Sequence, residues 1–220
     1  LPPLPKDVGD IARWVTSQVF ESLARLGQTK IYGLLLHRSE DVFGSRGAQL
    51  IQALASLKAN GFVQKIGVSV YNPNELVEVC KKINLDLVQV PLNIVDRRFH
   101  INGWLDRLKN NGVEIHARSV FLQGLLLMKR DKIPRKFLRW STLLDEWEEN
   151  LKTSRDSAVA ACLAYPLSLE EVDRVIVGVD NASQLNEILQ ATEQFDGGLD
   201  TSFMCSTDLD LLNPSNWELL

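Results

Sequence analysis

The chain has 220 residues, of which 45% are hydrophobic and 24% are charged, and its formal net charge is −4. This composition is typical of a globular domain and excludes collagen-like, mucin-like and disordered chains. The negative charge argues against a nucleic-acid partner, because proteins that bind nucleic acids non-specifically are usually basic. The longest apolar runs are short, so we expect no segment that spans a membrane.

The cysteines and the first residues indicate the compartment and the extent of the chain. Cys80, Cys162 and Cys205 are far apart and form no C-x-x-C pair, so we expect reduced thiols, a cytoplasmic protein and no metal site. The chain begins Leu-Pro-Pro-Leu-Pro without an initiator Met, and no signal-peptide pattern follows. This beginning predicts that the sequence is cut from a larger one.

Helical and β-rich segments alternate along the chain. Apolar residues recur at three- and four-residue spacing over 7–26, which predicts a leading helix. Its buried face should hold Ile11, Val15, Val19, Leu23 and Leu26. The next segments are expected to be a strand over 31–37, a helix over 45–60, a strand over 65–70, a helix over 73–83, a strand over 85–90, a helix over 102–111 and a strand over 113–119.

The second half continues with an insertion. After it come further elements of the same kinds and a tail without a clear period. In order, they are an insertion over 122–152 with a helix over 137–151, a helix over 154–163, a strand over 173–178, a helix over 182–194 and the tail over 195–220.

Five strands that alternate with helices predict an α/β fold with a parallel sheet, because such strands pair through right-handed crossovers. No Pro-, Gly- or Ser-rich linker divides the chain, so we expect one domain over 1–220. Two architectures accommodate these strands: a doubly wound sheet and a part of a (β/α)8 barrel. The dinucleotide-binding doubly wound fold needs a G-x-G-x-x-G loop after its first strand, and 37–44 has none. The barrel is therefore favoured, and a cofactor-free doubly wound sheet stays open.

Polar residues stand at the ends of the strands, where a (β/α)8 barrel carries its chemistry. They are His37, Ser69, Gln89 with Asn93, Arg118 with Ser119, and Gly178 with the helix start that follows it. Each also has a purely structural interpretation, such as a histidine bound to a loop carbonyl or an Arg118–Asp96 ion pair. Polar residues at all five strand ends favour a functional site on one rim.

Five segments carry motifs of one known family. Ile31-Tyr-Gly-Leu-Leu-Leu-His37 is similar to a strand that ends in an active-site histidine, and Ala117-Arg-Ser-Val-Phe-Leu-Gln-Gly-Leu-Leu126 is similar to A-Y-S-P-L-A-Q-G-L-L. The other three are 66–72 (I-G-V-S-N-F-N), 87–97 (the next strand, with its Gln) and 175–185 (V-I-P-G-x-x-x-x-x-Q-L). Together they resemble the aldo-keto reductases. The resemblance implies a TIM barrel of which this chain holds five β/α units, strands 4–8, with a leading helix and the first three strands absent.

The resemblance also implies an activity and a cofactor. It predicts an oxidoreductase that reduces aldehydes or ketones, sugar-derived ones among them, by hydride transfer from NADPH, with NADH as the alternative. His37 would be the catalytic residue that orients and polarises the carbonyl. Ser69 and Gln89 would bind the nicotinamide carboxamide. The other implied cofactor-binding residues are Arg118 at the nicotinamide ring, Ser119, Gln123 and Gly124 around the pyrophosphate, and Gly178, Asp180, Asn181 and Gln184 at the adenosine end.

The chain departs from the family pattern at three positions. Val70 replaces an Asn that follows the Ser, and Arg118 replaces an aromatic residue, although a planar guanidinium also stacks on rings. Gln184 stands where the family has a basic residue for the 2′-phosphate, and Asp180 nearby is acidic. These acidic and neutral residues weaken the case for NADP over NAD.

The family's catalytic Tyr, Lys and Asp belong to the three strands that this chain lacks. Tyr32, Tyr71 and Tyr165 match other family positions, so we interpret them as packing residues. A reduction without its general acid is slower by about 10²–10⁴-fold. The alternative function is therefore a catalytically inactive barrel fragment that binds only a nucleotide or a partner protein. Two strands would lack neighbours, so we expect pairing with the missing N-terminal segment or with a second copy.

Overall fold

The computed structural model describes residues 1–154, 156–193 and 201–219. Its helices and strands are, in chain order, α1 (Ile11–Leu26), β1 (Ile31–Leu36), α2 (Gly44–Ala59), β2 (Val63–Ser69), α3 (Pro73–Val79), β3 (Leu87–Pro91), α4 (Arg98–Ile101), α5 (Trp104–Asn110), β4 (Glu114–Arg118), α6 (Ser141–Ser154), α7 (Ala158–Leu167), β5 (Arg174–Val175), α8 (Ala182–Glu193) and α9 (Leu209–Leu212). The 3₁₀ helices are η1 (Ser39–Val42), η2 (Leu125–Leu127), η3 (Arg130–Lys132), η4 (Arg135–Trp140), η5 (Ser202–Met204) and η6 (Pro214–Leu219).

The strands follow one another in the sheet in the order β1-β2-β3-β4-β5. β1 pairs in parallel with β2, β2 with β3, and β4 with β5. This confirms the prediction of an α/β fold with a parallel sheet. A doubly wound sheet reverses its strand order at a switch point, so an order without reversal contradicts that alternative.

The chain divides into two compact units. The first comprises Leu1–Val90 with Asp106–Ile115, and the second comprises Pro91–Leu105 with His116–Leu220. The single domain expected over 1–220 stays a prediction. No helix within the described residues has both the length and the apolar character that crossing a membrane requires.

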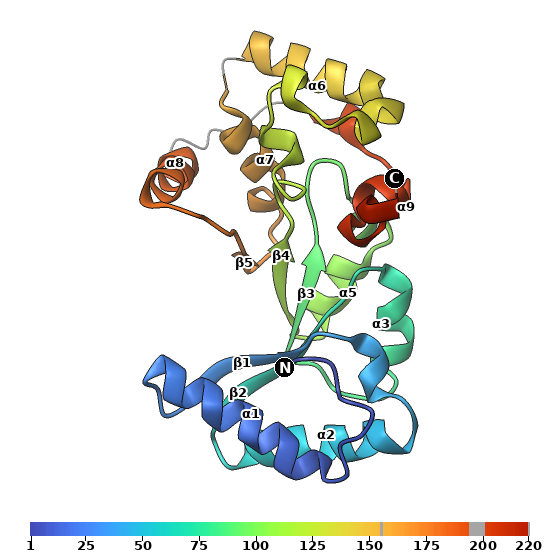
Figure 1. Ribbon diagram of the computed structural model, residues 1–220, viewed down its shortest axis with the longest axis vertical. Coiled ribbons are helices and arrows are strands. Elements are labelled where there is room, and N and C mark those ends of the chain that lie inside the picture. Colours follow the sequence, from blue (N-terminus) through green and yellow to red (C-terminus); the bar gives the residue numbers. More distant parts are fainter. Residues whose placement is uncertain (155, 194–200, 220) are drawn as a thin grey trace. The chain divides into compact units, whose positions relative to one another are not determined.

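In the first unit, helix α1 confirms most of its predicted buried face. Its predicted stripe from Ile11 to Leu23 is buried, and α1 lies beside α2, which contacts β2 (Figure 1). The helix begins where the Asp10 side chain accepts a hydrogen bond from the Arg13 N–H at 2.9 Å. Leu26 was expected to be buried but is 63% exposed, because it is the last helical residue and Gly27 turns the chain away with a φ of 62°.

Two predicted elements are shorter in the structure. The helix expected over 102–111 is α5, which begins only at Trp104 because Gly103 before it has a left-handed φ of 68°. The short helix α4, over Arg98–Ile101, is not among the predicted elements. The strand expected over 173–178 contains only Arg174 and Val175. Its partner β4 ends at Arg118 and Ser119 then turns with a φ of 60°, so the ladder has no further residues to pair with.

Two other helix boundaries also differ from the prediction. The helix expected over 73–83 ends at Val79, beyond which single turns hold the chain. The helix expected over 154–163 is α7, which starts later because the Ser157 hydroxyl accepts a hydrogen bond from the Ala160 N–H. The last helix is confirmed over 182–193, and Gln194, at its expected end, lies outside the described residues.

The second unit has its own apolar core, which includes the insertion and the tail. The Trp147 Nε1–H donates to the Leu126 carbonyl at 3.0 Å and so ties α6 to the loop after β4. The tail lies partly outside the described residues, but over 201–219 it forms η5, α9 and η6 rather than an irregular segment. From the insertion and the tail, this core contains Phe137, Trp140, Trp147, Leu122, Leu126, Leu144, Met204, Leu211 and Leu212.

Candidate functional site

A cavity of about 690 Å³ lies in the second unit. It is formed by the loop after β4, the start of α7, and the segment that runs from β5 into α8. Its walls include every predicted cofactor-binding residue of this unit except Asn181. These residues are Arg118, Ser119, Gln123, Gly124, Gly178, Asp180 and Gln184.

The loop after β4 has an unusual backbone. Ser119, Leu122 and Gln123 have positive φ values of 60°, 46° and 53°, and Gly124 follows with 82°. Non-glycine residues rarely adopt this region, and such strain persists only where the surroundings hold it in place. We therefore expect contacts from residues outside the loop to hold its backbone in this conformation.

Asn93 supplies that support. It is fully buried, and its Nδ2 donates to the Ser119 carbonyl at 3.0 Å. Its Oδ1 accepts from the backbone N–H groups of Val95 and Asp96, at 2.9 and 2.8 Å. Sequence reasoning noted Asn93 at a strand end but assigned it no role. The sequence indicated the importance of Asn93 in one way, because it is a single amide residue within the otherwise apolar run from Leu92 to Val95.

Arg118 is half-buried at the end of β4, and its Nη1 donates to the Ser119 hydroxyl at 3.0 Å. The carboxylate of Asp96, considered from the sequence as a partner for Arg118, is fully buried and forms its ion pair with Arg98 at 2.7 Å. Arg118 thus adds positive charge to the cavity wall, and it also helps to orient the Ser119 hydroxyl there.

The turn into α8 is held by its own side chains. The Asn181 Oδ1 accepts from the Gln184 N–H at 3.0 Å, and the Gln184 Oε1 accepts from the Asp180 N–H at 2.7 Å. Two backbone donors at this helix start are therefore already bonded within the turn. At Gly178, an added Cβ would meet no atom within 4 Å, so the backbone there is open to close approach.

The remaining predicted residues belong to the first unit. Ser69 and Gln89 are register partners on β2 and β3, and the Ser69 hydroxyl lies 3.3 Å from the Gln89 Oε1 as a hydrogen-bond donor. His37 directly follows β1, has an exposed side chain, and donates its backbone N–H to the Leu1 carbonyl at 3.2 Å. A single concavity that joins these three with Arg118 stays a prediction.

Comparison with known proteins identifies the family. Residues 3–197 match the aldo/keto reductase family. The chain belongs to that family. It is 28% identical over 213 residues to L-glyceraldehyde 3-phosphate reductase of Escherichia coli K12, which covers 86% of this chain and 61% of that protein. It is 24% identical over 192 residues to the NADH-specific methylglyoxal reductase of the same organism, which covers 80% and 59% respectively.

A solved structure shares the fold of this aldo/keto reductase chain. The aldo-keto reductase AKR11C1 of Bacillus halodurans, in its apo form, superposes with a TM-score of 0.73 at 24% identity, over 88% of this chain and 67% of that one. At this level of identity the likeness shows the fold alone. The chain spans about half to three-fifths of the length of the curated relatives that it matches.

Outside the cavity, this aldo/keto reductase chain has a half-buried cluster of Arg97, His100 and Tyr165 that the sequence did not reveal. The Tyr165 hydroxyl lies 2.8 Å from the His100 Nδ1, and the Arg97 guanidinium lies 4.2 Å from the centre of the Tyr165 ring. Burial raises the pKa of Tyr165 to about 12. The Arg97 side chain also bonds the carbonyl and hydroxyl of Thr201, which joins α4 to the start of the tail.

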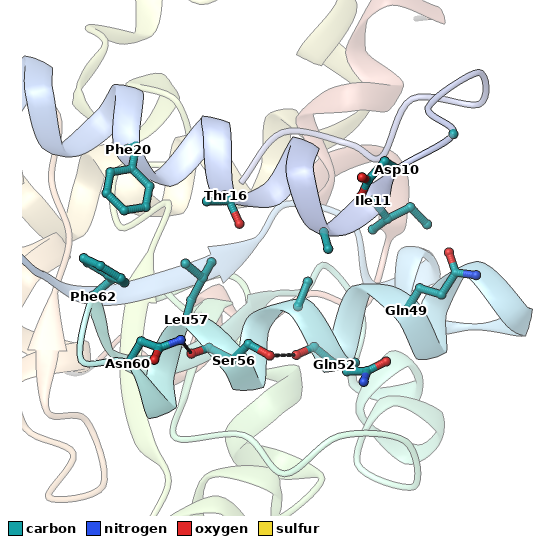
Figure 2. Close-up of a pocket in the computed structure, with 13 residues that line it drawn as sticks. Asp10, Ile11, Thr16, Phe20, Gln49, Gln52, Ser56, Leu57, Asn60 and Phe62 are labelled. Carbon is teal, nitrogen blue, oxygen red and sulfur yellow. Dashed lines mark hydrogen bonds between the residues drawn. The ribbon is translucent and has the colours of Figure 1, made fainter.

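A second hollow lies between α1 and α2 of the first unit, with a volume of about 700 Å³ (Figure 2). Phe20, Leu57 and Phe62 form apolar parts of its wall, and amide and hydroxyl side chains form much of the rest. Asp10 is its one ionisable residue among the described ones, and that carboxylate caps α1. Among the described residues of this groove no further acid or base is present to activate a hydroxyl, so the groove is a weaker candidate for catalysis than the cavity of the second unit.

Proposed function

We propose that this chain is part of an aldo/keto reductase that reduces aldehydes or ketones, and that the cavity of the second unit binds its nicotinamide dinucleotide. The observation that carries the proposal is the convergence of two distant segments, 118–124 and 178–184, on one cavity. Its volume of about 690 Å³ lies within the range of cofactor sites in proteins.

The residues in the cavity suit the parts of such a cofactor. Ser119 and Gln123 offer a hydroxyl and an amide to the charged pyrophosphate, and Gly124 leaves room for the backbone to approach it. The planar guanidinium of Arg118 would stack on the nicotinamide ring, and Gly178 would leave room for the adenosine end. Asn181, outside the cavity walls, would act at the adenosine end by holding the turn into α8.

Three residues of the first unit act on the reacting end in this proposal. The dinucleotide, when bound, supplies the hydride. Ser69 and Gln89 lie close enough to bind one amide group together, which would orient the nicotinamide. His37 would donate a hydrogen bond to the carbonyl oxygen of the substrate and so polarise it.

We also propose that the five strands are strands 4–8 of a barrel, within one domain. β1 is an edge strand, and Leu1 already bonds its outer side: the Leu1 ammonium donates to the Leu35 carbonyl at 2.7 Å, and the His37 N–H donates to the Leu1 carbonyl at 3.2 Å. Leu1 thus donates to residue 35 and accepts from residue 37, two positions further along β1. This is the hydrogen-bond pattern of two parallel strands. A further parallel strand beside β1 would therefore fit, and strands of that kind would bring the Tyr, Lys and Asp.

The names of the relatives indicate a substrate class. One is a reductase of L-glyceraldehyde 3-phosphate and another is a reductase of methylglyoxal, which are both small aldehydes. We propose short aldehydes, including sugar-derived ones, as substrates. The alternative is a catalytically inactive fragment that binds only a nucleotide or a partner protein. The same cavity would serve that function if no other segment supplies the general acid.

The test separates binding from chemistry. Fluorescence titration of the 220-residue chain with NADH and NADPH should detect binding, and Arg118→Ala should weaken it about tenfold, since the guanidinium that would stack on the nicotinamide ring is lost. Arg135→Ala, at an exposed arginine outside the cavity, is the matched control and should change nothing.

In a cofactor-oxidation assay with methylglyoxal or glyceraldehyde, the chain alone should show no turnover, and a chain extended upstream should show it. Absence of binding by either dinucleotide would contradict the proposed cofactor site. Inactivity of the extended chain would favour the inactive alternative.

A further inference from the structure

The cavity wall at α8 is acidic. Asp180 and Glu187 both line the cavity, and the sequence from Val175 to Glu193 contains no Lys, Arg or His. Among the described residues of the cavity walls, Arg118 alone carries a positive charge, and it belongs to the loop after β4 rather than to this wall. An anionic group placed against the α8 wall would thus meet two carboxylates and no cation.

Two backbone donors of the same wall are already bonded by side chains of the turn. The N–H groups of Asp180 and Gln184 are bonded to the side chains of Gln184 and Asn181, at 2.7 and 3.0 Å. A helix start binds phosphate through such donors, so bonding them internally weakens that use. Gln184 therefore stabilises the turn and does not reach outward as a basic side chain would.

NADH and NADPH differ by a single phosphate on the ribose of the adenosine half. That monoester carries about 1.5–2 negative charges at neutral pH and needs cationic or N–H partners. A free ribose hydroxyl is instead a donor that a carboxylate accepts, as acidic residues do in NAD-binding folds. We propose that this cavity selects NADH over NADPH, with Asp180 and Glu187 as the residues that reject the 2′-phosphate. This inference rests on the proposed function.

Calorimetric titration of the chain measures the selectivity without any turnover. NADH should bind at least about tenfold more tightly than NADPH at low ionic strength, and the ratio should fall as salt screens the two carboxylates. ADP-ribose and its 2′-phosphorylated form test the adenosine half alone. They should show the same preference, since the discriminating group is on that half.

Two glutamates of α8 provide a matched pair of variants. Glu187 lines the cavity, whereas Glu193 is exposed on the same helix and does not line it. Glu187→Gln should raise the affinity for NADPH severalfold and leave that for NADH nearly unchanged, and Glu193→Gln should alter neither. Gln184→Arg adds a cation to the wall and should shift the ratio further toward NADPH, while Gln190→Arg adds the same charge to α8 outside the cavity and should not.

The outcomes distinguish this inference from the proposed function. Binding of NADPH as tight as that of NADH would overturn the inference and leave the dinucleotide site in place. An equal effect of Glu187→Gln and Glu193→Gln would also overturn it, because the discrimination would then come from overall charge and not from the cavity wall. Failure of both dinucleotides and of ADP-ribose to bind would contradict the proposed function and this inference together.

Discussion

Single side chains determine the local geometry of the cavity. Asn93 is fully buried and makes three side-chain hydrogen bonds, to Ser119, Val95 and Asp96, and so fixes a loop whose backbone is otherwise strained. The amide has the right combination of donor and acceptors for this role, which neither a carboxylate nor an apolar side chain of the same size would have. The shape of the loop after β4 therefore depends on a residue that does not itself line the cavity of the second unit.

Asn93→Ala should destabilise the protein and also impair the site. The substitution leaves a buried carbonyl and two buried N–H groups without their partner, which costs about 1–3 kcal/mol in free energy of unfolding. Dinucleotide binding should weaken as the loop relaxes. Urea unfolding and fluorescence titration measure the two effects. Asn84→Ala, at an exposed amide, is the control, and equal losses in the two variants would contradict the role of Asn93.

Tyr165 should ionise unusually late. Its pKa rises from the ordinary 10.0 to about 12 because burial penalises the phenolate. The unfolded chain loses this proton first, so the free energy of unfolding gains nothing from this group below pH 10 and falls as the pH rises from 10 toward 12. Ultraviolet absorbance of tyrosinate should show a late step that Tyr165→Phe removes. An unchanged titration curve in that variant would show that the late step does not belong to Tyr165.

At the scale of elements, ion pairs, a hydrogen bond and a ring contact join the tail to the insertion. The Arg139 guanidinium of η4 pairs with Asp208 at 2.8 Å and with Asp210 at 3.1 Å, and the Trp140 Nε1–H donates to Asp208 at 3.0 Å. Next to this ion pair, the rings of Phe137 and Trp217 pack edge to face at 4.8 Å. The tail, for which the sequence shows no clear period, is thus ordered by its contacts with the insertion.

This contact between η4 and α9 should open in acid. The hydrogen bond from Arg139 lowers the pKa of Asp208 below its usual 3.8. A lowered pKa means that the stabilisation is present above the unfolded value and is lost as the pH falls through the folded value. Asp208→Asn should therefore raise amide exchange over 201–219 at neutral pH, and the wild type should match it only in strong acid. Asp131→Asn should leave this exchange unchanged, and an equal rise there would contradict the assignment.

At the scale of the whole molecule, the sheet ends in the edge strands β1 and β5. Edge strands present unpaired N–H and C=O groups that attract another strand. In the proposed barrel those edges would pair with strands outside this chain, and the two ends of the sheet would depend most on other segments for stability.

The chain alone should associate in solution. Sedimentation velocity over a range of concentrations should show monomers in equilibrium with larger species, because exposed edges pair between copies. A chain extended upstream should sediment as a smaller, concentration-independent species and unfold at a higher temperature. A strictly monomeric 220-residue chain at all concentrations would show that its edges are already protected.

Much of the architecture was predictable from the sequence because it rests on local rules. The stripe of α1 and its stop at Gly27 follow from spacing and a left-handed glycine. The start of α3 at Pro73 follows from a capping box, in which Asn72 and Glu75 bond each other's backbone. The order of the motifs likewise indicated the family, because each motif is a short contiguous segment.

Only the tertiary structure decided the rest. β5 stops at Val175 because of the turn that a different segment makes at Ser119, and that turn depends in turn on Asn93. In the sequence, Gln184 is notable only because it replaces a basic residue. The structure shows that its side chain accepts a hydrogen bond from the Asp180 N–H. Spacing along the chain determines which residues share a face of a helix or strand. Contacts between segments far apart in the sequence determine which of those faces enclose a cavity, and no local pattern encodes them.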